Sequence, residues 1–237
     1  MVTGVRALRL HGLRNLPDAE DVHLLVPPGC RTGSTGFVTF ERTTRIPAPH
    51  TRLEIPLAPV HRAVLDAARR QSDVDTVLAM MAESVQRRRC TVKALADELR
   101  EGNQRGTAIA RRALTPLLNG AHSVAEADAW MLWRDSGLPD CQWNVKLFSA
   151  DGRYIATPDA WFDEVGLAWE IDSRGSHSER DNFAGTLARN ARYVAAGVVV
   201  LQTLPARLRT EPGKVLAEIR AAYETAVRRP RPDVHLR

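Results

Sequence analysis

The stretch that decides the fold reads TPDAWFDEVGLAWEID and spans residues 157–172. Its two ends, 157–162 and 167–172, carry Trp, Phe, Leu and Ile and are typical of short strands. Between them, 163–166 holds Asp, Glu and Gly, which favour turns. The pattern predicts a hairpin, and a hairpin would bring Asp159 close to Glu170 although the two are far apart in sequence.

Three carboxylates of this hairpin are expected to converge. Side chains alternate between the faces of a strand, so Glu170 and Asp172 point the same way, toward Asp159. Converging carboxylates repel one another unless a cation or a shared proton neutralises them, and this predicts a Mg²⁺ or Mn²⁺ site. The structural alternative is that Asp159 only starts a strand after Pro158, while Glu170 and Asp172 line the solvated face of a half-buried strand.

The surrounding segments complete an α/β (α+β) domain over residues 121–228. Hydrophobic periodicity and turn residues predict, in order, a helix at 124–135, strands at 142–148 and 153–162, the strand at 167–172, a helix at 180–196, a strand at 198–201 and a helix at 212–228. The first three strands would form a meander, and the fourth would follow a crossover helix. The Pro/Arg-rich tail, 229–237, is expected to be mobile.

With its surroundings, the hairpin resembles the PD-(D/E)XK nuclease superfamily, and more closely the Vsr-like, restriction-endonuclease-like domains at the C-termini of many actinobacterial proteins. The residues that carry the resemblance are Glu126 on the preceding helix, Pro158-Asp159, Glu170-Ile171-Asp172 and the following Ser173-Arg174-Gly175-Ser176-His177. The resemblance covers residues 121–228. It implies an endonuclease-like αβββαβα fold, a Mg²⁺ or Mn²⁺ cofactor, a DNA partner and hydrolysis of phosphodiester bonds.

The resemblance also assigns roles to the acidic residues. It implies that Asp159, Glu170 and the carbonyl of Ile171 hold the metal ion. The superfamily usually carries a lysine two residues after the glutamate, where this chain has Asp172. That residue would be a further ligand or would orient the attacking water. Lys146 is an alternative replacement for the lysine.

Three other motif residues have both a functional and a structural interpretation. Glu126 stands three residues after Ser123, so it either forms a capping box with that serine or faces the metal site. His177 either transfers protons as a general acid or base or is an exposed loop histidine. Arg174 either binds the scissile phosphate or pairs with a neighbouring acid.

Residues 1–120 predict a smaller α/β and helical region. Strands are expected at 22–26, 36–41 and 52–57, and helices at 5–13, from Pro59, at 74–88, after Thr91 and at 106–118. The boundary to the next domain is expected at 116–123, around Asn119-Gly120. This region resembles the middle of AbiEi-type antitoxin proteins, whose usual N-terminal winged helix we do not expect in residues 1–120. The resemblance implies a second function: a non-catalytic transcriptional regulator or type IV antitoxin with a degenerate nuclease fold, partnered by a toxin or by itself.

Charge is distributed unevenly along the chain. The formal net charge is +5, from 33 Lys+Arg and 28 Asp+Glu. Residues 1–120 hold 18 basic and 12 acidic residues, whereas 121–237 hold 15 and 16. Arg87, Arg88 and Arg89 are candidates for contacts with DNA phosphates, although such charges also simply solvate a helix end and arginine richness also follows from codon bias.

Several protein classes are not expected. Apolar residues make up 44% of the chain, which is ordinary for a globular protein, and no run approaches the roughly 18 apolar residues of a membrane span. We expect no signal peptide and a cytoplasmic location. The three cysteines form no CxxC pair, and no glycine-rich nucleotide motif is present, so no disulfide framework, zinc ribbon or small-molecule cofactor is predicted.

Overall fold

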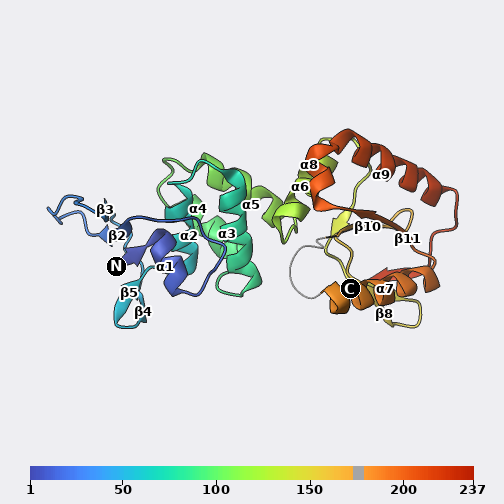
Figure 1. Ribbon diagram of the computed structural model, residues 1–237, viewed down its shortest axis with the longest axis horizontal. Helices are drawn as coiled ribbons and strands as arrows, with labels where there is room; N and C mark the ends of the chain where they lie inside the picture. Colours follow the sequence, from blue (N-terminus) through green and yellow to red (C-terminus); the bar gives the residue numbers. More distant parts are fainter. Residues whose placement is uncertain (173–178) are drawn as a thin grey trace. The chain divides into compact units, whose positions relative to one another are not determined.

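The computed structural model describes residues 1–172 and 179–237. They form two compact units (Figure 1). Unit 1 comprises Met1–Leu118 and His122–Val124, and unit 2 comprises Asn119–Ala121 and Ala125–Arg237. The division falls at Asn119-Gly120, where the sequence places a domain boundary.

Unit 1 contains a mixed sheet with the strand order β3-β2-β1-β5-β4. Its strands are β1 (Val2–Thr3), β2 (Val22–Val26), β3 (Val38–Arg42), β4 (His50–Arg52) and β5 (Ile55–Leu57). The single strand expected at 52–57 is wrong, because β4 and β5 form an antiparallel hairpin there. Leu53 and Glu54 make its turn with φ angles of 49° and 61°, the left-handed backbone that a two-residue hairpin turn requires.

Five helices accompany this sheet among the described residues of unit 1: α1 (Gly4–Leu10), α2 (Val60–Ala68), α3 (Val74–Gln86), α4 (Val92–Glu101) and α5 (Ala108–Leu118). Thr91 caps α4 as predicted, since its hydroxyl accepts the backbone N–H of Ala94 at 3.0 Å. Side chains such as Val64 and Leu78 are fully or almost fully buried and form the helical core.

Unit 2 holds two sheets, with the orders β11-β10-β9-β6 and β12-β7-β8. Its strands are β6 (Gln142–Trp143), β7 (Leu147–Ser149), β8 (Tyr154–Ala156), β9 (Ala160–Phe162), β10 (Leu167–Ile171), β11 (Val199–Thr203) and β12 (Val234–Leu236). Its helices are α6 (Val124–Arg134), α7 (Glu179–Ala195), α8 (Pro205–Thr210) and α9 (Pro212–Val227). The predicted hairpin of β9 and β10 is confirmed, and β11, reached through the crossover helix α7, lies parallel to β10. The chain is therefore a mixed α/β protein, as expected.

Two expectations for unit 2 are wrong. The three-stranded meander is instead divided between the two sheets, because the backbone leaves the strand conformation at Asn144, where φ is 54°, and again around Pro158. A left-handed residue cannot continue a pleated strand, and proline lacks the N–H that a strand ladder needs. The tail that we expected to be mobile contains β12, which pairs antiparallel with β7.

Strand β10 lies at the centre of unit 2, and all five of its residues are buried. Figure 1 shows β10 and β11 between α9 and α7. Leu167 and Trp169 pack on one face with residues of α9, such as Ile219, whereas Ala168 packs on the other face with Tyr193 of α7. Alternation places Glu170 on this second face, under α7. The interpretation of Glu170 as part of a solvated face is therefore wrong.

Candidate active site

Asp159 lies immediately before β9 and extends the hairpin through its side chain. Backbone pairing between β9 and β10 ends at Ala160 and Trp169. Two residues farther along β10, the N–H of Ile171 donates to Oδ2 of Asp159 at 2.6 Å. This bond holds the carboxylate against the end of β10, where Glu170 and Asp172 flank Ile171.

Glu170 is 3% exposed and is held by two side chains of α7. The hydroxyl of Tyr193 donates to its Oε1 at 2.6 Å, and Nη1 of Arg189 lies 3.2 Å from its Oε2. Arg189 and Tyr193 are four residues apart and so share one face of the helix. Sequence reasoning missed both residues. Their spacing is visible in the sequence, but nothing there indicates that this face of α7 turns toward Glu170.

Glu126 of α6 joins the same region through Asn144. The side-chain amide of Asn144 donates to Oε2 of Glu126 at 2.8 Å and to the carbonyl of Gly120 at 2.8 Å. The backbone N–H of Asn144 donates to the carbonyl of Asp159 at 3.1 Å. Asn144 was also missed, although asparagine is among the residues that most readily adopt the left-handed conformation found here.

Burial and electrostatic repulsion shift the pKa values of Asp159 and Glu170. Burial, together with the nearby Glu126 and Glu170, raises the pKa of Asp159 from 3.8 to about 7, against the opposing effects of the Ile171 N–H and Arg189. Burial also raises the pKa of Glu170, and Asp172 adds to this, while Tyr193 and Arg189 oppose it. The structure thus brings Glu126, Asp159 and Glu170 together, with Asp172 beside Glu170. We call these four residues the acidic cluster.

The structure describes only some of the other predicted site residues. Asp172 follows β10 directly, is half-buried, and donates its backbone N–H to the Thr203 carbonyl at 2.9 Å. Arg174 and His177 fall outside the described residues. Lys146 is exposed.

The three consecutive arginines expected to contact DNA belong to unit 1, whereas the acidic cluster belongs to unit 2. Arg87, Arg88 and Arg89 follow the end of α3 and are exposed. Arg87 pairs with Glu83 of the same helix, with its Nε 2.5 Å from Oε1, whereas no such pair occurs for Arg88 or Arg89 within the described part of the chain.

The donor chemistry of the acidic cluster fits a hard divalent cation. Asp159 uses only Oδ2 in hydrogen bonding among the described residues, and the oxygens of Glu170 keep lone pairs beyond those used by Tyr193 and Arg189. Within residues 1–172 and 179–237, no three or more His, Cys, Asp or Glu side chains are arranged to hold a metal ion together. The expected set differs from such a group, because it combines two carboxylates with the backbone carbonyl of Ile171.

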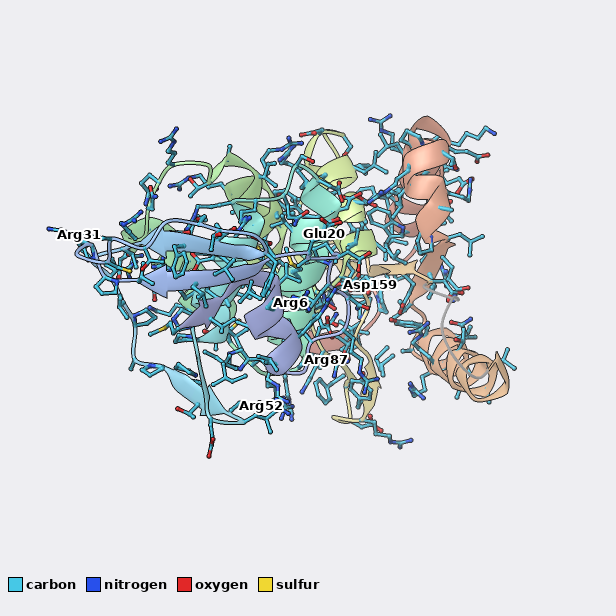
Figure 2. All side chains as sticks on the ribbon, turned by 60° about the vertical axis from the view of Figure 1, so that its left-hand side comes forward. Arg6, Glu20, Arg31, Arg52, Arg87 and Asp159 are labelled. Atoms are coloured by element: carbon cyan, nitrogen blue, oxygen red, sulfur yellow. The ribbon has the colours of Figure 1, made fainter. Side chains whose placement is uncertain are left out.

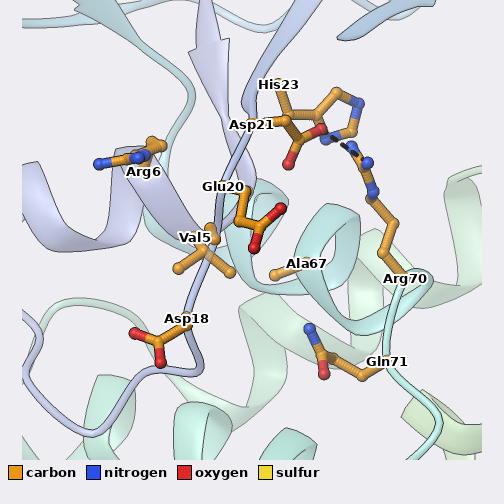
Figure 3. Close-up of a pocket in the computed structure, with 11 residues that line it drawn as sticks. Val5, Arg6, Asp18, Glu20, Asp21, His23, Ala67, Arg70 and Gln71 are labelled. Atoms are coloured by element: carbon orange, nitrogen blue, oxygen red, sulfur yellow. Dashed lines mark hydrogen bonds and ion pairs between the residues drawn. The ribbon is translucent and has the colours of Figure 1, made fainter. Parts of the chain in front are cut away.

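Unit 1 contains a cavity of about 290 Å³ between the segment before β2 and the end of α2 (Figure 3). Asp21 and Arg70 line it and pair at 2.7 Å. His23 also lines it, with Nε2 3.0 Å from Oε2 of Glu41. None of the site residues predicted from the sequence lines this cavity.

The chain matches no protein-family model, no curated protein and no solved structure. In the described residues, no helix has both the length and the apolar character needed to cross a membrane. Function is therefore inferred from the residues themselves.

Proposed function

We propose that unit 2 is a metal-dependent, DNA endonuclease-like domain of the PD-(D/E)XK type. One observation carries the proposal: the Asp159 carboxylate accepts the N–H of Ile171 beside Glu170, and burial together with Glu126 and Glu170 raises its pKa to about 7. Such crowding of carboxylates destabilises a protein at neutral pH unless a cation compensates for it. Arg189 supplies only one positive charge among these side chains.

The supporting architecture is the hairpin with its crossover. Glu170 stands on the central strand β10, which is antiparallel to β9 and parallel to β11. Helix α7 makes the crossover and covers the face that carries Glu170. The hairpin, the crossover helix and the parallel strand after it are parts of the endonuclease-like order that the resemblance implies, and we include that finer fold in the proposal.

In the proposed site, Asp159, Glu170 and the Ile171 carbonyl would hold Mg²⁺ or Mn²⁺. Once bound, the ion would polarise a phosphate oxygen and lower the pKa of a water molecule. Asp172 would orient that water in place of the usual lysine. Arg189 also belongs to the site: its side chain is 29% exposed, and this exposed part would contact a phosphate oxygen of DNA while Nη1 remains on Glu170.

A second candidate function has a specific observation in its favour. Both oxygens of Glu170 already interact with protein side chains, Tyr193 and Arg189. Together with Asp172 at the lysine position, this favours a degenerate nuclease fold in a non-catalytic regulator or antitoxin. In that case the acidic cluster would be structural, and the protein would bind DNA or a protein partner without cutting DNA.

Calorimetry with Mg²⁺ and Mn²⁺ separates the two functions. The variants are Asp159→Asn and Glu170→Gln, which keep the side-chain shapes, and the matched control is Asp151→Asn, which removes a carboxylate from the exposed turn between β7 and β8. The nuclease proposal expects binding in the wild type and in the control, and loss of binding in both site variants. It also expects Mn²⁺-dependent cleavage of plasmid DNA that both site variants lose.

Other outcomes would contradict the nuclease proposal or favour the regulator. No metal binding by the wild type, even with Mn²⁺ and DNA present, would overturn the nuclease proposal. DNA binding that persists in EDTA, without strand cleavage in Mn²⁺, would support the regulator.

A further inference from the structure

Four basic side chains from three separate segments of unit 1 gather in one place. His11 follows α1, His50 and Arg52 stand on β4, and Arg89 follows α3. We call these four residues the basic cluster. The rings of His11 and His50 lie 5.8 Å apart, edge to face. A Cβ atom added to Gly12 would lie 3.9 Å from Nη2 of Arg89, so this guanidinium reaches the end of α1.

The local backbone fixes two of these segments. His50 and Arg52 are two residues apart on β4 and therefore point to the same face. The end of α3 is closed by a Schellman motif, in which Arg89 N–H donates to the Ser84 carbonyl at 2.9 Å and Arg88 N–H to the Val85 carbonyl at 2.8 Å. Arg88 takes the left-handed conformation, with φ at 54°, where glycine is usual. This reversal sets the direction in which Arg89 leaves the helix.

The charges of the basic cluster repel one another. Burial lowers the pKa of His11, and His50, Arg52 and Arg89 lower it further, while a hydrogen bond to the Ala58 carbonyl opposes the shift. No carboxylate is among the causes of this shift. His50, Arg52 and Arg89 are therefore close enough to His11 to disfavour its protonation.

Several other arginines of unit 1 are paired with carboxylates, although, in the ranges that the structure describes, Arg31, Arg88 and Arg105 are not. Those that pair with carboxylates include Arg45, Arg62, Arg69, Arg70, Arg87 and Arg100. Among the described residues, Arg52 and Arg89 have neither an ion pair nor a side-chain hydrogen bond. Both are exposed, as is His50. Gathering uncompensated like charges on a folded surface costs free energy, and an anionic partner would recover it.

We infer that the basic cluster is a docking surface for the phosphate backbone of DNA. Guanidinium groups bind phosphate oxygens with two parallel hydrogen bonds, and such contacts hold a duplex without reading its sequence. Nε2 of His11 donates to the Ala58 carbonyl at 2.9 Å, so Nδ1 becomes a second donor only when the ring is protonated, a form that a neighbouring phosphate would favour. The choice of DNA over other polyanions rests on the function proposed for unit 2. The expectation that a polyanion binds here rests on the charge geometry alone.

Salt-dependent DNA binding by the full chain tests this inference. Fluorescence anisotropy would follow a labelled duplex in EDTA, with no divalent metal, over a range of KCl concentrations. The test variant is Arg52→Ala/Arg89→Ala. The matched control is Arg31→Ala/Arg105→Ala, which removes the same charge from two exposed arginines of unit 1 outside the basic cluster. Figure 2 shows Arg31 and Arg52 at separate projections of unit 1.

The expected result is a specific loss in the test variant. Each phosphate contact contributes about 0.9 to the slope of log K against log salt for duplex DNA, so losing two contacts should lower the slope by about 2. At ~0.1 M KCl, affinity should fall by tenfold or more, while the control keeps most of the wild-type affinity.

Two outcomes would overturn the inference. One is equal weakening in the test and control variants. The other is no duplex binding by the wild type at low salt, including the case in which anionic vesicles bind instead. Neither outcome bears on unit 2, because EDTA removes any contribution from metal binding, and the function proposed for unit 2 is judged separately by calorimetry and cleavage.

Discussion

Replacing Asp159 with asparagine should stabilise unit 2, and the gain should grow as pH rises. The amide matches the shape of the carboxyl group, and its oxygen can still accept the N–H of Ile171, which donates at 2.6 Å in the wild type. Asparagine cannot ionise. The variant therefore removes the buried negative charge and leaves the packing of the hairpin in place.

The magnitude follows from the raised pKa. In the unfolded chain the Asp159 carboxyl loses its proton near 3.8, whereas in the folded protein its pKa is about 7. The folded state holds the extra proton between these values, so the contribution of Asp159 to wild-type stability is greatest at low pH and declines as pH rises toward 7. Between pH 5 and pH 8.5, the protonation of Asp159 differs between the folded and unfolded states over about two pH units. At roughly 1.36 kcal/mol per unit, the free energy of unfolding of the wild type should fall by about 3 kcal/mol from this group.

Urea denaturation, monitored by tryptophan fluorescence, measures the free energy of unfolding of unit 2. All five tryptophans of the chain lie in unit 2, the first at Trp130 and the last at Trp169. In EDTA, the stability of Asp159→Asn minus that of the wild type should be about 3 kcal/mol larger at pH 8.5 than at pH 5. The control Asp151→Asn should show no such increase, because a hydrogen bond from Ser149 lowers the pKa of this exposed carboxyl. An equal difference at the two pH values would refute the reasoning.

Three further perturbations have expected outcomes. Tyr193→Phe removes the donor to buried Glu170 and should destabilise unit 2 by about 1–3 kcal/mol in the same urea assay; no change would show that the bond at 2.6 Å is unimportant. The pKa of His11 is lowered chiefly by burial, so its contribution to the stability of unit 1 should be complete above about pH 6.5 and should be lost as pH falls. Hydrogen exchange of α1, compared between the wild type and His11→Gln, would detect this loss. Gly166→Ala should destabilise unit 2 by about 2–4 kcal/mol, because φ is 71° and the added Cβ would lie 2.2 Å from Cδ of Pro232; wild-type stability in this variant would contradict the close approach of Pro232 to this turn.

Local sequence signals were enough to predict the central hairpin and the described helices other than α8. The turn residues at 163–166 stand between two apolar runs, and β9 and β10 form where they imply. The strand breaks at Asn144 and Pro158 were not anticipated, although both residues are visible in the sequence. Alternation of apolar residues continues through 142–148 and hides the change of backbone at Asn144.

The site could be predicted only as far as the hairpin geometry reaches. Asp159 and Glu170 follow from pairing two strands, but their partners Arg189 and Tyr193 depend on which face of α7 packs on β10. That choice is made by tertiary contacts, since Tyr193 is fully buried with residues of several strands. Glu126 required the family resemblance, because its position after Ser123 was equally suitable for a capping box.

Arg189 is the residue that best separates the two proposed functions. Glu170 is buried, and removing the positive charge beside it would leave an uncompensated carboxylate, an effect that typically destabilises a protein by about 3–5 kcal/mol. Arg189→Met, which keeps an apolar side chain of similar reach, should therefore destabilise unit 2 in EDTA under either function.

The effect of Mn²⁺ on this variant is what differs. In a metal site the ion supplies the missing positive charge, so Mn²⁺ at about 100 times its dissociation constant should restore about 2.7 kcal/mol. In a structural cluster Arg189 is the intended counter-ion, and Mn²⁺ should restore nothing. The double variant Asp159→Asn/Arg189→Met completes the comparison, because recovery that persists without the Asp159 carboxylate would show that the ion binds elsewhere. Recovery in the single variant alone would place the ion between Asp159 and Glu170, where the raised pKa values indicate that negative charge is in excess.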